Sequence, residues 1–425
     1  MCLRAACHKL VSYIWPFITK QRRNGNTYMI EQKNLQYDVV SAGGGLSGVF
    51  AAAAAARTGA KTLLLERTGM LGGMAVQGII LREVYHQTEL LDKFLSILKD
   101  LGGLYNLPAY PPGLLPVAIN GETLKLALFR ICRENSVDVL LYSEACSLDQ
   151  HKGKVSGLRA LAKNMFFQIE APVVIDATGT GDLVRRSGVW HTESSLYAYA
   201  AVILTGMNPA LLCHRWKQAF VQDGFAAGQP GAQYCGPLYA GSPVCTVTIC
   251  TEPRRCLVEF PVKCQADSLN PLSRTQAIAE AHLKCFKLME TLNRAPGFEQ
   301  VRLSSLPPQL ILRQTPPGKA LLPEASNIPE NIAAAAIGET GAVQYFSLED
   351  LALSQPGGLM VCGRLAAIYT HTNEMNTGAA LATGEAAGVC GALAAQKGCH
   401  PREINASQIR ETLELTLTEE KEEKK

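Results

Sequence analysis

Glycines at a fixed spacing mark the first place where this sequence could do chemistry. Gly43, Gly45 and Gly48 follow the short β-branched segment Tyr37–Ser41 and precede the alanine run Ala51–Ala56. In a strand–turn–helix unit such glycines let the chain turn tightly, let a phosphate approach the backbone and let the helix pack on the strand. The helix N-terminus adds free N–H groups and partial positive charge. The pattern therefore predicts a site for a nucleotide diphosphate.

An acidic residue at the end of the next segment indicates how a ribose would be held. Lys61–Glu66 has the composition of a buried strand, and Glu66 lies 18 residues beyond Gly48. That spacing is close to the ~20 residues expected before the acid that hydrogen-bonds ribose hydroxyls. A carboxylate at this position disfavours a 2′-phosphate. The segment predicts a dinucleotide other than NADP, and the alternative is an ordinary glycine turn in an α/β sheet.

Further glycine-rich segments narrow the choice of cofactor. They are Arg67–Gly73, Val173–Gly179, Gly358–Arg364 and Gly378–Gly388. With these motifs the sequence resembles the flavin-dependent oxidoreductases of the glutathione-reductase-like superfamily. Within it, the sequence is similar to the FAD-dependent oxidoreductase family related to the flavoprotein subunit of heterodisulfide reductase. The resemblance extends over residues 37–413.

This resemblance implies FAD as the cofactor. The first glycines would hold the diphosphate, Glu66 the adenosine ribose and Ala145 the adenine, while Arg364 and a helix that opens near Gly384 would reach the ribityl chain and flavin. The residues expected to bind FAD are Ala42, Gly43, Gly45, Leu46, Ser47, Gly48, Glu66, Arg67, Gly72, Gly73, Ala145, Thr178, Gly179, Gly363, Arg364, Thr383 and Gly384.

Candidate catalytic residues also come from the resemblance. His371 stands where the family has a Thr-His pair, and a proton acceptor beside a flavin suits hydride chemistry. Arg313, in an Arg-x-Ser/Thr motif, could anchor a carboxylate or a flavin oxygen. Either residue could instead have a structural role. The family continues from this motif with two further arginines, whereas this chain has Pro316 and Pro317.

Asp176 and the cysteines have structural interpretations. Asp176 ends an apolar strand, and we expect its carboxylate to order its own turn. Five of the 14 cysteines lie between Cys235 and Cys264, but no C-x-x-C pair occurs, and clusters need closely spaced thiolates. Cys245 and Cys250 would face opposite sides of one strand. We therefore expect small apolar core residues and no metal site.

The order of the predicted elements gives the fold class. Strands and helices alternate up to Tyr142, which predicts an α/β fold: a Rossmann-like domain with a parallel sheet and an antiparallel β-meander, plus a second α+β substrate domain. The expected boundaries are an N-terminal extension (1–36), a first FAD-binding part (37–188), a substrate or cap domain (189–345), a C-terminal FAD-binding part (346–414) and a charged tail (415–425). A helix capped by Asn120 is expected at Gly121–Glu134.

Composition excludes several classes of protein. The net charge is +3, with 47% hydrophobic and 18% charged residues, which suits a globular enzyme better than a nucleic-acid binder. No membrane span is expected, and the cysteine content favours the cytoplasm. We predict an enzyme that transfers a hydride between a small organic substrate and the flavin. The alternatives are a subunit that relays electrons to a protein partner and a flavin-binding protein that has lost catalysis.

Overall fold

The computed structural model describes residues 31–77, 79–81, 88–106, 117–188, 196–208, 233–237, 244–250, 252–266, 270–306, 310–314, 331–337, 342–368 and 377–413. The chain forms two compact units, Met1–Glu31 and Gln32–Lys425. The elements below belong to the second unit, apart from the first residue of β1. The predicted division of this unit into domains stays a prediction.

A five-stranded parallel sheet forms the centre of the nucleotide-binding part. Its order is β20-β11-β2-β3-β7, and each neighbouring pair is parallel. The strands are β2 (Val39–Ala42), β3 (Thr62–Glu66), β7 (Asp138–Leu141), β11 (Val173–Asp176) and β20 (Leu359–Val361). β2, β3, β11 and β20 are buried along their whole length, as expected of parallel strands covered on both faces. The predicted α/β class is confirmed.

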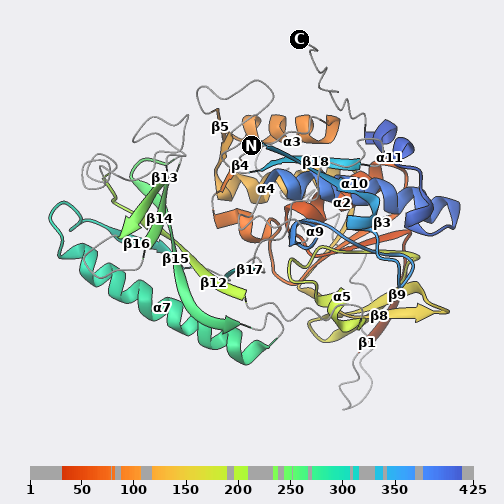
Figure 1. Cartoon of the computed structure of the whole chain (residues 1–425), viewed down its shortest axis with the longest axis horizontal. Coiled ribbons are helices and arrows are strands. Elements are labelled where there is room, and N and C mark those ends of the chain that lie inside the picture. The colour runs from red at the N-terminus through yellow and green to blue at the C-terminus, as the bar shows by residue number, and fades with distance from the viewer. Residues whose placement is uncertain are drawn as a thin grey trace, which may run out of the picture. The chain divides into compact units, whose positions relative to one another are not determined.

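Helices α2 (Leu46–Arg57) and α10 (Thr377–Lys397) lie side by side next to this sheet (Figure 1). Glycines of α10 permit the close approach: a Cβ on Gly384 would lie 2.3 Å from the carbonyl oxygen of Ser47, and a Cβ on Gly388 would lie 2.2 Å from that of Ala51. The prediction that this helix opens near Gly384 was wrong. It begins at Thr377, about two turns earlier, and the small residues serve the packing of two helices.

An antiparallel sheet of order β1-β10-β9-β8 follows the predicted meander. Its strands are β1 (Glu31–Gln36), β8 (Ser143–His151), β9 (Lys154–Ala162) and β10 (Met165–Glu170). The predicted N-terminal extension reached residue 36, but β1 already belongs to this sheet. Alternation is weak in Glu-Gln-Lys-Asn-Leu-Gln, since only Leu35 is a strong apolar residue, and tertiary pairing decides the strand.

A second antiparallel sheet has the order β13-β14-β15-β12-β16, with β17 paired to β12. The strands are β12 (Leu196–Thr205), β13 (Gln233–Pro237), β14 (Val244–Ile249), β15 (Arg255–Ala266), β16 (Arg302–Ser305) and β17 (Ile311–Gln314). Helix α7 (Pro271–Asn293) lies along this sheet (Figure 1). The stripe that α7 buries consists of Ala277, Ala281, Cys285, Leu288 and Leu292.

The cysteines of the second sheet pack in its core. Cys245 belongs to the cluster under α7, whereas Cys250 packs against the other cluster, with Ala201 and Ile203. Their predicted opposite orientation is confirmed. Burial raises the pKa of Cys250 to about 12 and raises that of Cys256 as well. Among the residues that the structure describes, no group of three or more His, Cys, Asp or Glu side chains could hold a metal ion.

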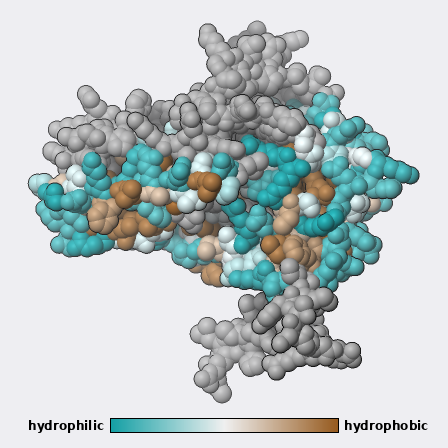
Figure 2. Space-filling view, turned by 90° about the horizontal axis from the view of Figure 1, so that it is seen from below, coloured by the Kyte–Doolittle hydropathy of each residue, from teal (hydrophilic) through white to brown (hydrophobic). Residues whose placement is uncertain are grey.

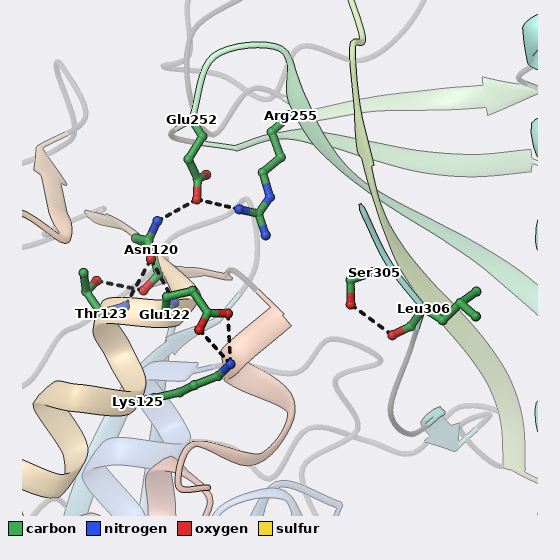
Figure 3. Close-up of polar contacts among 8 residues, drawn as sticks. All are labelled: Asn120, Glu122, Thr123, Lys125, Glu252, Arg255, Ser305 and Leu306. Carbon is green, nitrogen blue, oxygen red and sulfur yellow. Dashed lines mark hydrogen bonds and ion pairs between the residues drawn. The ribbon is translucent and has the colours of Figure 1, made fainter. Parts of the chain in front are cut away.

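A polar contact between described residues joins the nucleotide-binding part to the second sheet (Figure 3). Asn120 caps α4 (Gly121–Glu134), as predicted: its Oδ1 accepts from the N–H groups of Glu122 and Thr123. Its Nδ2 donates to Oε1 of Glu252 at 2.6 Å, and Nη1 of Arg255 donates to the same oxygen at 2.9 Å. The cap of α4 is therefore tied to the turn between β14 and β15.

The remaining elements are short or flank the parallel sheet. They are η2 (Gly73–Gln77), β4 (Ile79–Leu81), α3 (Glu89–Asp100), β5 (Leu104–Asn106), β6 (Val117–Ile119), α5 (Asp182–Arg186), β18 (Asn331–Ile337), β19 (Ala342–Ser347), α8 (Leu348–Leu351), α9 (Arg364–Ile368), η4 (Pro401–Glu403) and α11 (Ala406–Leu413). β18 and β19 pair with each other, and β18 packs on α10.

Apolar residues are distributed differently on the two long helices. α10 has the length and hydropathy of a membrane span, which the sequence-based prediction did not single out, but it is buried within the fold among the described residues. On α7 the large apolar residues Leu272, Leu283 and Phe286 are exposed. Figure 2 shows hydrophobic residues on one side of the molecule as separate patches among hydrophilic ones.

Candidate cofactor site

A cavity of about 410 Å³ opens where strands β2, β3 and β11 of the parallel sheet end. Carboxyl ends of parallel strands are the usual ligand-binding edge of such sheets. Thirteen of the seventeen residues predicted to bind the cofactor line this cavity. They are Ala42, Gly43, Gly45, Leu46, Ser47, Glu66, Arg67, Gly72, Gly73, Ala145, Thr178, Gly179 and Arg364. The fold thus brings together segments more than 300 residues apart.

The first glycine turn leads from β2 into α2. Gly43 has a φ of +119°, and a Cβ there would lie 2.3 Å from the carbonyl oxygen of Ala177, so only glycine fits. Gly45 is the N-cap of α2, and a Cβ on it would meet no atom within 4 Å. The backbone at Gly45 therefore faces open space at the end of α2, where the first N–H groups of the helix have no intrahelical partner.

Glu66 ends β3 and is buried beside this turn. One carboxylate oxygen accepts a hydrogen bond from the N–H of Gly44 at 2.7 Å, and the other accepts from the N–H of Thr68 at 2.7 Å. Each carboxylate oxygen can accept a further hydrogen bond. Glu66 lines the cavity, so its carboxylate both holds the backbone of the turn and is available to hydroxyl groups of a ligand.

The second glycine turn packs on the first. The N–H of Gly72 donates to the carbonyl of Gly44 at 2.7 Å, and Gly72 forms a parallel bridge with Gly45. Gly73 then starts η2, whose Met74, Ala75 and Val76 line the cavity. The two turns thus form one continuous backbone surface.

Asp176 orders the turn after β11, as predicted. One oxygen accepts from the N–H and hydroxyl of Thr178 at 3.0 and 2.6 Å, and the other accepts from the N–H groups of Leu183 and Val184 at 2.9 and 3.0 Å. Complete burial raises the pKa of this carboxyl, and the hydrogen bonds from Thr178 and Val184 oppose the rise. Asp176 thereby fixes Thr178, which lines the cavity.

The opposite end of the predicted cofactor site contains β8. Ala145 lines the cavity, and its carbonyl oxygen accepts a hydrogen bond from Nη1 of Arg186 at 2.6 Å. Nη2 of the same arginine lies 3.3 Å from the carboxylate of Glu144. Arg186 of α5 therefore connects Ala145, the residue predicted to lie against adenine, with the turn that Asp176 orders.

Four predicted residues do not line the cavity; they pack beside it. A Cβ on Gly48 would lie 1.8 Å from the carbonyl oxygen of Gly43, and one on Gly363 would lie 2.4 Å from the hydroxyl of Ser47. The hydroxyl of Thr383 accepts from the N–H of Gly363 at 2.9 Å. Gly384 contacts α2, as described above. The structure places these residues in the packing between α2, β20 and α10.

The structure does not describe the side chain of either predicted catalytic residue. His371, Pro316 and Pro317 lie outside the described residues. For Arg313 only the backbone is described, and it lies on β17 opposite Tyr197 of β12. Their roles stay predictions.

Sequence reasoning missed several residues of the cavity wall. Arg274 and Ile278 come from α7, Leu310 immediately precedes β17, and Thr377 and Ala380 come from the first turn of α10. The sequence contained one indication for the two α7 residues. Arg274 and Ile278 are four residues apart, a spacing that places both on one face of a helix. Burial lowers the pKa of Arg274, and the positive charge of Arg67 lowers it further, while Asp182 opposes the shift.

The profile of a protein family described as "FAD dependent oxidoreductase" matches residues 38–317. This chain belongs to that family. The matched region contains both glycine turns, Glu66, the β11 turn and the second sheet with α7. FAD is accordingly the cofactor of this enzyme.

Solved structures show the same fold at low sequence identity. A geranylgeranyl bacteriochlorophyll reductase-like protein from Thermoplasma acidophilum is 15% identical with a TM-score of 0.52, covering 89% of this chain and 83% of its own. The p-nitrophenol 4-monooxygenase of Pseudomonas putida DLL-E4 is 12% identical with a TM-score of 0.54, covering 90% of this chain and 87% of its own. These similarities confirm an α/β fold with parallel and antiparallel sheets.

The described residues fit FAD. The open space at the Gly45 position and the N-terminus of α2 suit a diphosphate, which needs N–H donors and close backbone approach. Glu66 retains acceptor capacity for ribose hydroxyls. Arg67, Arg274 and Arg364 supply positive charge around the same cavity.

Proposed function

We propose that this flavoenzyme transfers a hydride between a small organic substrate and its flavin. We place it in the branch related to the flavoprotein subunit of heterodisulfide reductase, on the glycine segments and the Arg313-Gln314-Thr315 motif. The observation that carries the proposal is the mixed wall of the cavity. Beside the glycine turns it contains the apolar side chains of Met74, Ile278, Leu310 and Ala380.

Apolar side chains beside a redox cofactor serve hydride transfer. When bound, FAD accepts or donates a hydride at N5. Side chains such as Met74 and Leu310 exclude water, which strengthens electrostatic interactions and protects the reduced cofactor from side reactions. Met74 also packs against a cluster of the second sheet that contains Ala201, Ile203 and Leu257. This contact supports a substrate-binding role for the second sheet, whose face adjoins the cavity wall.

We assign a role in the reaction to two side chains, the imidazole of His371 and the guanidinium of Arg313. Removal of a hydride from a C–H bond is usually coupled to loss of an O–H or N–H proton, and we assign His371 as the acceptor of that proton. Arg313 is assigned to an anionic or carbonyl oxygen of the substrate. Arg364 lines the cavity at the start of α9, which supports a contact with the ribityl chain or flavin.

Anaerobic reduction tests this proposal. Purified holoenzyme is mixed with candidate donors, and loss of the visible flavin absorbance is followed. We expect at least one small alcohol, amine or acid to bleach the flavin, and His371→Asn to slow bleaching without loss of bound FAD. Bleaching only by a reduced electron-transfer protein, with every small donor inactive, would instead identify a relay subunit.

A further inference from the structure

The inner face of α7 continues beyond the stripe of small and apolar residues that packs on the sheet. Its buried stripe starts at Ala277 and ends at Leu292. The same face continues toward the N-terminus with Arg274, and Ile278 flanks it; both line the cofactor cavity. A helix of 23 residues is about 34 Å long, so its first turns and its buried stripe can contact different parts of the protein. The first turns of α7 are therefore part of the cavity wall.

The first turn of α7 is held by its own cap. The side chain of Asn270 accepts hydrogen bonds from the N–H groups of Leu272 and Ser273 at 2.9 and 3.3 Å, and Pro271 occupies the first helical position. Both features favour a defined helix start. Arg274, half-buried one turn later, is thus presented by a fixed helix.

Arg274 shares the cavity wall with two other charged residues, Arg67 and Asp182. The charges of these two residues also shift the pKa of Arg274. Arg67 follows Glu66, the residue assigned to the adenosine ribose, and Asp182 follows the Thr178–Thr180 turn. Both positions belong to the adenosine half of the predicted cofactor site, whereas Arg364 belongs to the flavin half.

The arrangement favours an anion between the guanidinium groups. Burial and the proximity of Arg67 disfavour the positive charge of Arg274, and Asp182 offsets only part of this effect. A diphosphate carries two negative charges, and guanidinium groups bind phosphate oxygens through paired N–H donors. The N-terminus of α2 opens on the same cavity and favours the same charge.

We propose that Arg274 of α7, together with Arg67, binds the adenosine diphosphate half of FAD. The cofactor then contacts both the nucleotide-binding part and the second sheet's helix, so FAD binding stabilises the docking of α7.

Titration of the apoprotein tests the proposal without any substrate. FAD is added to apoprotein and its affinity is read from flavin fluorescence, and ADP is measured as a competitor. We expect Arg274→Gln to raise the Kd of FAD and of ADP by about tenfold or more, since charge-assisted hydrogen bonds are lost. Arg274→Lys keeps the charge but loses the paired donors, so its Kd values should lie between those of the wild type and those of Arg274→Gln. Bound FAD should also slow proteolysis near the start of α7 in the wild type.

The matched control is Arg294→Gln at the other end of the same helix. Arg294 is exposed and pairs with Glu290 at 2.5 Å, so its loss should leave both affinities unchanged. A Kd for FAD within threefold of wild type in Arg274→Gln would overturn the proposal. So would a weakened FAD affinity with unchanged ADP affinity, because Arg274 would then act on the flavin half. If Arg274→Gln does not fold, Arg274→Met, which also removes the charge and the paired donors, decides by the same criterion.

Discussion

The carboxylate of Glu66 accepts a hydrogen bond from the backbone N–H of Gly44 at 2.7 Å, across 22 positions in the sequence. Its second oxygen accepts from the N–H of Thr68. The acid at the end of β3 is therefore part of the glycine turn as well as part of the cofactor site. Sequence reasoning assigned it only the second role.

Replacing Glu66 should affect stability even without cofactor. Glu66→Ala leaves the buried N–H of Gly44 without its acceptor, at a cost of about 1–3 kcal/mol. The N–H of Thr68 belongs to an exposed residue and can bind water instead. Glu66→Gln keeps one acceptor oxygen, so its free energy of unfolding should decrease less than that of Glu66→Ala. Urea unfolding of the two apoproteins measures the difference. If Glu66→Ala were as stable as wild type, the turn would not depend on this carboxylate.

Gly45→Val should abolish FAD binding while the protein still folds. The backbone at Gly45 has φ −69° and ψ 178°, which any residue can adopt, and its Cβ would meet no protein atom within 4 Å. A valine side chain would instead occupy the space that the diphosphate needs. FAD content after purification and the circular dichroism spectrum are the measurements, with Gly45→Ala as the smaller step. Full FAD occupancy in Gly45→Val would place the diphosphate elsewhere.

Gly384→Ala should destabilise the protein by about 1–3 kcal/mol, the usual cost of overpacking. The added Cβ would lie 2.3 Å from the backbone of Ser47, which cannot move without shifting α2. Gly391→Ala is the control on the same helix, because its Cβ would approach the side chain of Val173 at 3.1 Å. Chemical denaturation compares the two. Equal stability of both variants would show that α2 and α10 separate readily.

Buried thiols should make the protein less stable in alkali. Burial raises the pKa of Cys132 and of Cys362 to about 12. Above the unfolded pKa near 9, the unfolded chain loses these protons while the folded chain keeps them, so stability falls as pH rises toward the folded pKa. The expected loss at pH 10 is about 1 kcal/mol per thiol.

Urea unfolding in reductant at pH 8 and pH 10 measures this loss. Cys132→Ala should show a smaller decrease between the two pH values than the wild type, although its stability at pH 8 is lower. An identical decrease in both proteins would assign the alkaline instability to other groups.

The sequence alone determined the local units of the cofactor site. The strand–glycine turn–helix at residues 39–57, the acid at Glu66, the Asn120 cap and the Asp176 turn depend on interactions within or between neighbouring segments. Backbone sterics and hydrogen bonding to nearby groups largely govern such units, so motif and spacing predict them. The resemblance to the FAD-dependent oxidoreductase family rested on several of these units, which occur in the family's order along the sequence.

Tertiary structure decided which residues share the cavity. Gly384 belongs to a glycine motif, yet packing of α10 on α2 turns it toward Ser47. Arg274 belongs to no motif, and it lines the cavity because the first turns of α7 lie there. Likewise β1 becomes a strand by pairing with β10, despite its weak pattern. Helix length, crossing and strand pairing depend on contacts between distant segments, and no local pattern records those contacts.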